Sequence, residues 1–134
     1  MKIVIIIVRS LLGLMFVVFG LNGFLQFMKM PPPQGLAGDF VKAMYMSHYF
    51  YVVAALQIVG GALLLTGRFA PLGLTLLGPV IVNILLFHIF LEPTGLPMAL
   101  VVSAVALFLL WAYRQAFSGL VKPSASTRAP GVSA

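Results

Sequence analysis

The chain has 134 residues, of which 62% are hydrophobic and only 7% are charged. Soluble domains carry about 25% charged residues, so this composition cannot cover a water-facing surface and suits a protein whose surface meets lipid. The eight Lys and Arg residues are scattered singly at the ends of apolar runs, which excludes a basic stripe for nucleic acid and points to anionic lipid headgroups. The absence of cysteine excludes disulfides, thiolate metal sites and dithiol redox chemistry.

Four apolar segments follow one another along the chain, and each is long enough, or nearly so, to cross a hydrocarbon layer of about 30 Å. The first lacks a small-residue cleavage site before a polar region, so we interpret it as a retained helix and not as a signal peptide. None shows the alternation typical of a membrane barrel. The sequence therefore predicts an all-α, integral membrane four-helix bundle within residues 1–117, with helices at about 3–27, 49–66, 72–91 and 96–113.

The connections between the segments differ in kind. Short turns around 69–71 and 92–97 predict antiparallel neighbouring helices. The longer connection begins with a stiff triple proline at 31–33. Apolar residues then recur at helical spacing around Asp39 and Lys42, which predicts a short amphipathic helix at the outer interface. The last segment, 118–134, is rich in Ser, Ala, Pro and Gly and is predicted to be a disordered cytoplasmic tail.

The positions of the basic residues predict the orientation of the bundle. Six of them fall on one side and two on the other, so both termini are expected in the cytoplasm. Arg9, Arg68 and Arg114 are expected to contact lipid headgroups, with the long side chain of Arg9 extending from its helix to reach them. The inner set is Lys2, Arg9, Arg68, Arg114, Lys122 and Arg128, and the outer set is Lys29 and Lys42.

A few polar residues interrupt the apolar segments, and in the predicted orientation they concentrate in the outer half of the membrane. Such residues hydrogen-bond across helices or line a functional site. Two pairs have i,i+4 spacing, which places each pair on one helix face. The two faces could meet in a small ligand-binding pocket, whereas a metal site lacks the dense ligand spacing that it needs. The candidate residues are Asn22, Gln26, Gln57, Asn83, His88 and Glu92.

Three stretches carry a resemblance to a known family. Arg9 precedes Ser-Leu-Leu-Gly-Leu and then Phe-Gly-Leu-Asn-Gly at 19–23. Leu-Gln-Ile-Val-Gly-Gly-Ala-Leu-Leu-Leu fills 56–65, and Leu-Gly-Pro-Val-Ile-Val-Asn-Ile-Leu-Leu-Phe-His fills 77–88. Over nearly all of 9–115 the chain resembles the DoxX-like small membrane proteins. The resemblance implies a four-helix bundle in a bacterial inner membrane, and an accessory part of a membrane redox or oxidative-stress system. Many members carry Glu where Gln57 stands, so proton-coupled chemistry at that position is not expected here.

Three functional hypotheses follow. The favoured one is a non-catalytic accessory or scaffold subunit that packs against a redox partner or another copy of itself in the lipid bilayer. The second is an oxidoreductase component that binds quinone in the outer polar pocket. The third is a small transporter, which needs a carboxylate within the membrane. That hypothesis is disfavoured because Glu92 lies close to the interface and Asp39 lies in a loop. An enzyme is thus less expected than a non-catalytic subunit.

Overall fold

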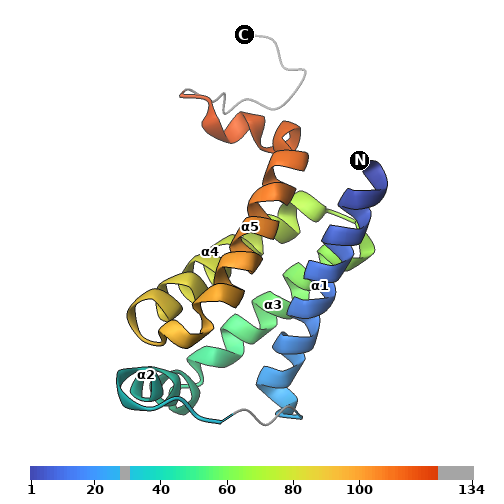
Figure 1. The fold of residues 1–134 in the computed structure, drawn as a ribbon. Coiled ribbons are helices and arrows are strands. Elements are labelled where there is room, and N and C mark those ends of the chain that lie inside the picture. The colour runs from blue at the N-terminus through green and yellow to red at the C-terminus, as the bar shows by residue number, and fades with distance from the viewer. Residues whose placement is uncertain (28–30, 124–134) are drawn as a thin grey trace.

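The computed structural model describes residues 1–27 and 31–123, and within them it contains helices and no strand. One connection, between α4 and α5, contains a 3-10 helix, and a second 3-10 helix follows α5 (Figure 1). In chain order the elements are α1 (Lys2–Leu25), α2 (Gly35–Met46), α3 (Tyr49–Thr66), α4 (Ala70–Phe90), η1 (Pro93–Gly95), α5 (Leu96–Ala112) and η2 (Arg114–Val121).

Four helical segments, α1, α3, α4 and η1 with α5, are long and apolar enough to cross a membrane. This confirms the all-helical fold and the four spans predicted from the sequence. Only 22% to 28% of each hydrophobic span is buried inside the protein. Most of the apolar surface therefore faces outward, as it does in a small bundle surrounded by lipid.

Left-handed residues fix where the helices begin and end. α3 ends at Thr66, and the next residue, Gly67, has a φ of 77°, which suits glycine. The Gly67 backbone N–H donates to the Leu63 carbonyl at 3.1 Å. Phe69 is also left-handed, with φ 55°, and Pro71 occupies the first turn of α4. α4 thus starts at residue 70, two residues before the predicted position. At the other end of the bundle, α1 ends at Leu25 because Gln26 adopts φ 52°.

α3 lies between α1 and α4 and contacts both through adjacent glycines. A Cβ atom added at Gly61 would lie 2.7 Å from the carbonyl oxygen of Gly13 in α1. A Cβ added at Gly60 would lie 2.6 Å from Leu77 Cγ in α4, and one added at Gly73 would lie 2.9 Å from the Gly60 carbonyl oxygen. Small residues are what allow helix backbones to approach so closely in membranes.

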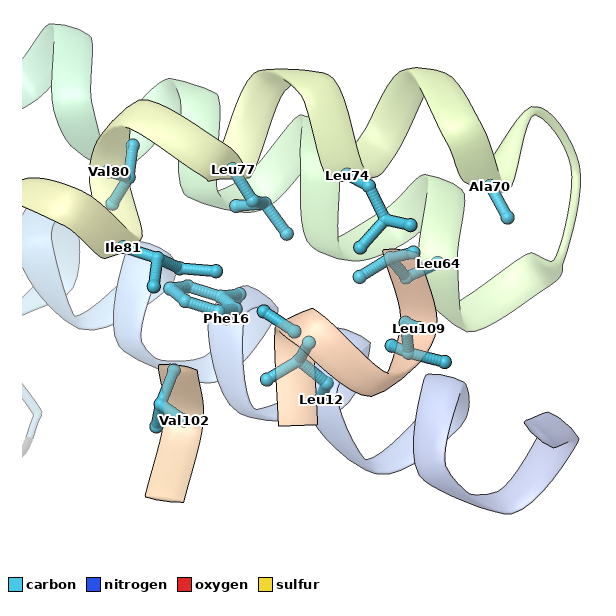
Figure 2. Packing of buried hydrophobic residues seen from close by; sticks show 11 residues of the cluster. Leu12, Phe16, Leu64, Ala70, Leu74, Leu77, Val80, Ile81, Val102 and Leu109 are labelled. Atoms are coloured by element: carbon cyan, nitrogen blue, oxygen red, sulfur yellow. The ribbon is translucent and has the colours of Figure 1, made fainter. Parts of the chain in front are cut away.

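A cluster of buried apolar side chains fills the interior of the bundle (Figure 2). It lies mainly in the half that holds the α3–α4 turn and the end of α5. Its most completely buried large members come from all four long helices: Phe16, Leu64, Leu77 and Leu109. Dispersion contacts of this kind, together with the glycine contacts, hold helices together where lipid gives no hydrophobic driving force.

The two ends of the bundle carry different elements (Figure 1). The start of α1, the α3–α4 turn and the end of α5 share one end, which we call the basic end. α2 and η1 lie at the opposite end, where α2 crosses the direction of the four long helices. Phe40 of α2 contacts Phe87 of α4, with ring centroids 5.7 Å apart.

The segment after α5 differs from its prediction. Residues 118–121 were expected to begin a disordered tail, but the 3-10 helix η2 continues to Val121. Phe117 packs against the buried cluster, and the Ser118 hydroxyl donates to the Gln115 carbonyl at 3.0 Å. These contacts hold the first turns of the segment. The rest of the predicted tail, 124–134, lies outside the described residues.

Candidate functional site

Charge is distributed unevenly between the two ends of the bundle. Lys2, Arg9, Arg68 and Arg114 lie toward the basic end. The chain has only two acidic residues, Asp39 in α2 and Glu92 after α4, and both lie at the opposite end. Each end therefore has its own set of candidate functional side chains.

His88 and Glu92, predicted to share a face, form part of the α4–α5 turn. The Nδ1 atom of His88 lies 3.0 Å from the Glu92 carbonyl oxygen and 3.9 Å from its carboxylate. The Thr94 hydroxyl donates to the same carboxylate. The His88 ring packs directly on Gly95, where a Cβ would collide with it, and meets Phe87 edge-on at 5.2 Å. These contacts bind the end of α4 to the start of α5.

Asn83 is exposed, and its side-chain amide donates to the Pro79 carbonyl of its own helix at 2.9 Å. Polar side chains in membrane helices often return to the preceding turn in this way. Thr75 and Ser103 do the same, donating at 2.9 Å and 2.8 Å to carbonyls four residues earlier. The hydrogen-bond donors of these side chains are therefore satisfied within their own helices.

Gln57 is the one polar or charged residue that is buried among residues 1–27 and 31–123, with 7% of its surface exposed. It shares the buried face of α3 with Ala54, Gly60 and Gly61. Its side chain forms no hydrogen bond within that part of the chain. Its amide atoms are not among the fully buried polar atoms left without a partner in that part of the chain, so the amide reaches the protein surface and is available to a bound polar group.

Asn22 and Gln26 are joined through the end of α1. The Gln26 backbone N–H donates to the Asn22 carbonyl at 2.8 Å, and the Gln26 side chain is exposed. The structure thus pairs Asn22 with Gln26 and His88 with Glu92, each pair at the end of its own helix. A pocket shared by the two pairs stays a prediction.

α2 packs on the bundle through aromatic contacts. The Tyr45 ring stacks on Phe50 of α3 with centroids 4.7 Å apart. Burial raises the pKa of the Tyr45 phenol, and the nearby Tyr51 phenol raises it further. Tyr45 therefore contributes a neutral, packed ring to this end of the protein.

Arg9 makes two contacts that the sequence did not predict. Its Nη1 atom donates to the Tyr113 hydroxyl at 3.4 Å, which links α1 to the end of α5. Its guanidinium also lies against Gly67, where an added Cβ would be only 2.7 Å from Nη1. The carbonyl end of the α3 dipole attracts a cation there. Arg9 therefore ties α1 to the ends of α3 and α5.

One sequence signal pointed toward this arrangement. Arg9 lies four residues before Gly13, and the same stripe of α1 continues through Gly20 and Gly23. All three glycines contact α3. Because the stripe faces α3, a side chain one turn before it reaches the end of that helix.

Arg68 and Arg114 are exposed at the basic end. The Arg114 guanidinium donates to the Trp111 carbonyl at 2.9 Å and lies 4.7 Å from the centre of the Trp111 ring. Tryptophan and arginine pairs of this kind are typical of the membrane–water boundary. Contact of Arg68 and Arg114 with headgroups stays a prediction.

Two apolar grooves flank α5. One, of about 230 Å³, lies between α4 and α5 and includes Gly78, Val82 and Ser103. The other, of about 200 Å³, lies between α1 and α5 and includes Val8, Met15, Val101 and Val105. None of the six predicted polar site residues lines either groove. Both grooves are suited to hydrocarbon chains or to apolar helix surfaces.

Over the described ranges, no three His, Asp or Glu side chains come together as a metal site. The chain matches no known protein family, no curated protein and no solved structure. Its class therefore rests on its own architecture. Four apolar helices with outward-facing hydrophobic surfaces define a multi-pass integral membrane protein.

Proposed function

We propose that this protein is a non-catalytic accessory or scaffold subunit, of DoxX-like type, in a redox or oxidative-stress system of a bacterial inner membrane. The observation that supports the proposal is how the polar side chains of the spans are used. Those of Thr75, Asn83 and Ser103 donate to their own helices. Such side chains stabilise helices and leave apolar surfaces for contact with neighbours.

α5 offers an apolar surface for a partner helix. Its exposed apolar side chains include Leu100, Val101 and Leu107. The groove between α4 and α5, which Leu107 lines, gives that surface a shape that a partner helix can fit. Packing between membrane helices depends on such shape complementarity and not on hydrophobicity alone.

Photo-crosslinking in whole cells tests the accessory role. A photoreactive residue at Leu107, which is 66% exposed on α5, is expected to form one adduct with a membrane redox protein identified by mass spectrometry. The matched control is Ile3, which is 72% exposed at the start of α1. Adducts with lipid alone, or equal adducts at both positions, would contradict the proposal.

The proposed orientation places both termini in the cytoplasm. The concentration of Lys and Arg at the basic end supports it. Because the chain has no cysteine, single cysteines report sidedness without background. Ser47→Cys is expected to react with an impermeant maleimide in intact cells, and Ser118→Cys only after permeabilisation. Both serines are exposed, and the reverse pattern would overturn the orientation.

In this orientation α2 lies at the outer interface. Leu36 and Phe40 are exposed apolar residues, and Phe40 touches Phe87 within a spanning helix. Asp39 and Lys42 are exposed on the same short helix. An interfacial helix needs such apolar and charged surfaces together.

Quinone binding is the second candidate, and the amide of Gln57 favours it. A quinone carbonyl is an acceptor for an amide N–H. Gln57→Leu is expected to abolish binding of a quinone analogue. If the quinone binds in the outer polar pocket predicted from the sequence, Asn83→Ala and His88→Ala are also expected to abolish it. Unchanged binding in all three folded variants would reject this candidate.

A further inference from the structure

Arg9 lacks an anionic partner in its surroundings. The whole chain contains two acidic residues, and both lie at the opposite end of the bundle. The guanidinium has five N–H donors, and its contacts are the Tyr113 hydroxyl and the backbone at Gly67. The Nε atom is buried without a partner among the described residues. A half-buried cation at the edge of a membrane is costly unless an anion accompanies it.

An apolar groove begins beside this cation. The groove between α1 and α5 starts at Val8, the residue before Arg9, and runs toward Met15 and Met98. Seven residues of helix separate Val8 from Met15, so the groove follows α1 for about 10 Å. The hydrogen bond from Arg9 to Tyr113 joins α1 to α5 on the basic-end side of this groove, whose last α5 residue is Val105. The Arg9 guanidinium thus lies near the basic end of the bundle, and the apolar groove extends from it toward the middle of the membrane.

We propose that an anionic phospholipid is held here, with its phosphate at Arg9 and one acyl chain in the α1–α5 groove. An arginine binds a phosphate with two parallel hydrogen bonds, which suits its planar guanidinium. Lys2, Arg9, Arg68 and Arg114 lie toward this end and neither acidic residue does, so the charge favours an anionic lipid over a zwitterionic one.

The groove between α4 and α5 is the less suitable one. It has a similar volume and is also lined by apolar residues. The arginines next to this groove are Arg68, before α4, and Arg114, after α5, and both are exposed, whereas Arg9 is half-buried. The Arg114 guanidinium is also engaged by the Trp111 carbonyl and ring. The α4–α5 groove therefore has no half-buried cation beside it, and acyl chains in it are expected to exchange freely with the bilayer.

Native mass spectrometry of the purified full chain tests the proposal. The detergent solution contains equal amounts of phosphatidylglycerol and phosphatidylcholine with identical acyl chains. The wild type is expected to retain one phosphatidylglycerol in preference to phosphatidylcholine. Arg9→Gln is expected to lower that preference about tenfold, because a charge-assisted hydrogen bond is lost. Arg114→Gln also removes one positive charge at this end, and this variant is expected to keep the preference for phosphatidylglycerol.

A second pair of variants tests the groove and leaves Arg9 intact. Val101 is 58% exposed in the α1–α5 groove, and Val82 is 55% exposed in the α4–α5 groove. Val101→Phe fills the first groove and is expected to lower retention of phosphatidylglycerol, whereas Val82→Phe is not. This pair decides the matter if Arg9→Gln fails to fold.

Three results would overturn the proposal. The first is equal retention of the two lipids by the wild type. The second is equal loss in Arg9→Gln and Arg114→Gln, which would show attraction by net charge alone. The third is equal retention by Val101→Phe and Val82→Phe, which would show that the acyl chain lies elsewhere.

Discussion

The contact between Gly13 of α1 and Gly61 of α3 gives the sharpest test of how the bundle is packed. A Cβ added at Gly13 would lie 2.6 Å from the Gly61 carbonyl oxygen and 2.7 Å from the Leu65 backbone nitrogen. Both atoms belong to a helix backbone, so neither can rotate away. Gly13→Ala therefore has to push α1 and α3 apart along their whole contact.

A matched glycine isolates the steric cost. Replacing glycine by alanine inside a helix stabilises it by roughly 1 kcal/mol when space is free. Gly78 in α4 has that space, because no atom lies within 4 Å of an added Cβ. Overpacking a close contact costs about 1–3 kcal/mol. The helix-propensity gain is common to both variants, so Gly13→Ala should be less stable than Gly78→Ala by about 1–3 kcal/mol.

Equilibrium unfolding in mixed micelles measures this difference. The protein is titrated with increasing SDS in a mild detergent, and helix content is followed by circular dichroism. Gly61→Ala is expected to resemble Gly13→Ala, since its added Cβ would lie 2.7 Å from the Gly13 carbonyl oxygen. Equal stabilities of Gly13→Ala and Gly78→Ala would refute the close backbone contact between α1 and α3.

Three further predictions concern the two ends of the bundle. Gly95→Ala should destabilise the protein by about 1–3 kcal/mol, because its Cβ displaces the His88 ring, and this cost should shrink when His88→Ala is added; equal costs in both backgrounds would contradict that contact. Arg9→Ala should lower the unfolding temperature more than Arg114→Ala, since Arg9 ties α1 to the ends of α3 and α5. The opposite ranking would argue against this link. The raised pKa of Tyr45 means that ionisation favours the unfolded state, so stability is full below pH of about 10 and falls above it. Tyr45→Phe should remove part of that loss in unfolding measured between pH 9 and 11, and an unchanged pH profile would count against it.

The spans were predictable because length and hydrophobicity are local properties of the sequence. The left-handed Phe69 shows the limit of that reasoning, since nothing in its side chain requires φ 55°. The turn after Gly67 imposes it, and α4 begins at residue 70 as a result. The 3-10 helix η2 depends similarly on Phe117 reaching a cluster built by four other helices.

The candidate site was predictable in part. Sequence spacing placed His88 beside Glu92, and the structure joins them. Sequence alone did not show that Asn83 donates to its own helix, because a side chain chooses between intrahelical and interhelical partners only once the helices are packed. Arg9 was expected to extend into the headgroup region, yet it also contacts Gly67 and Tyr113. Those contacts depend on where α3 and α5 end.

The neighbouring glycines of α3 set its angular position about its own axis. Successive residues point about 100° apart around a helix, so Gly60 contacts α4 while Gly61 contacts α1. Turning the helix by a single residue would present a bulkier side chain to one of these neighbours. Insertion or deletion of one residue just before this pair would therefore disturb both contacts at once, which makes α3 the least tolerant place in the chain for a change of length.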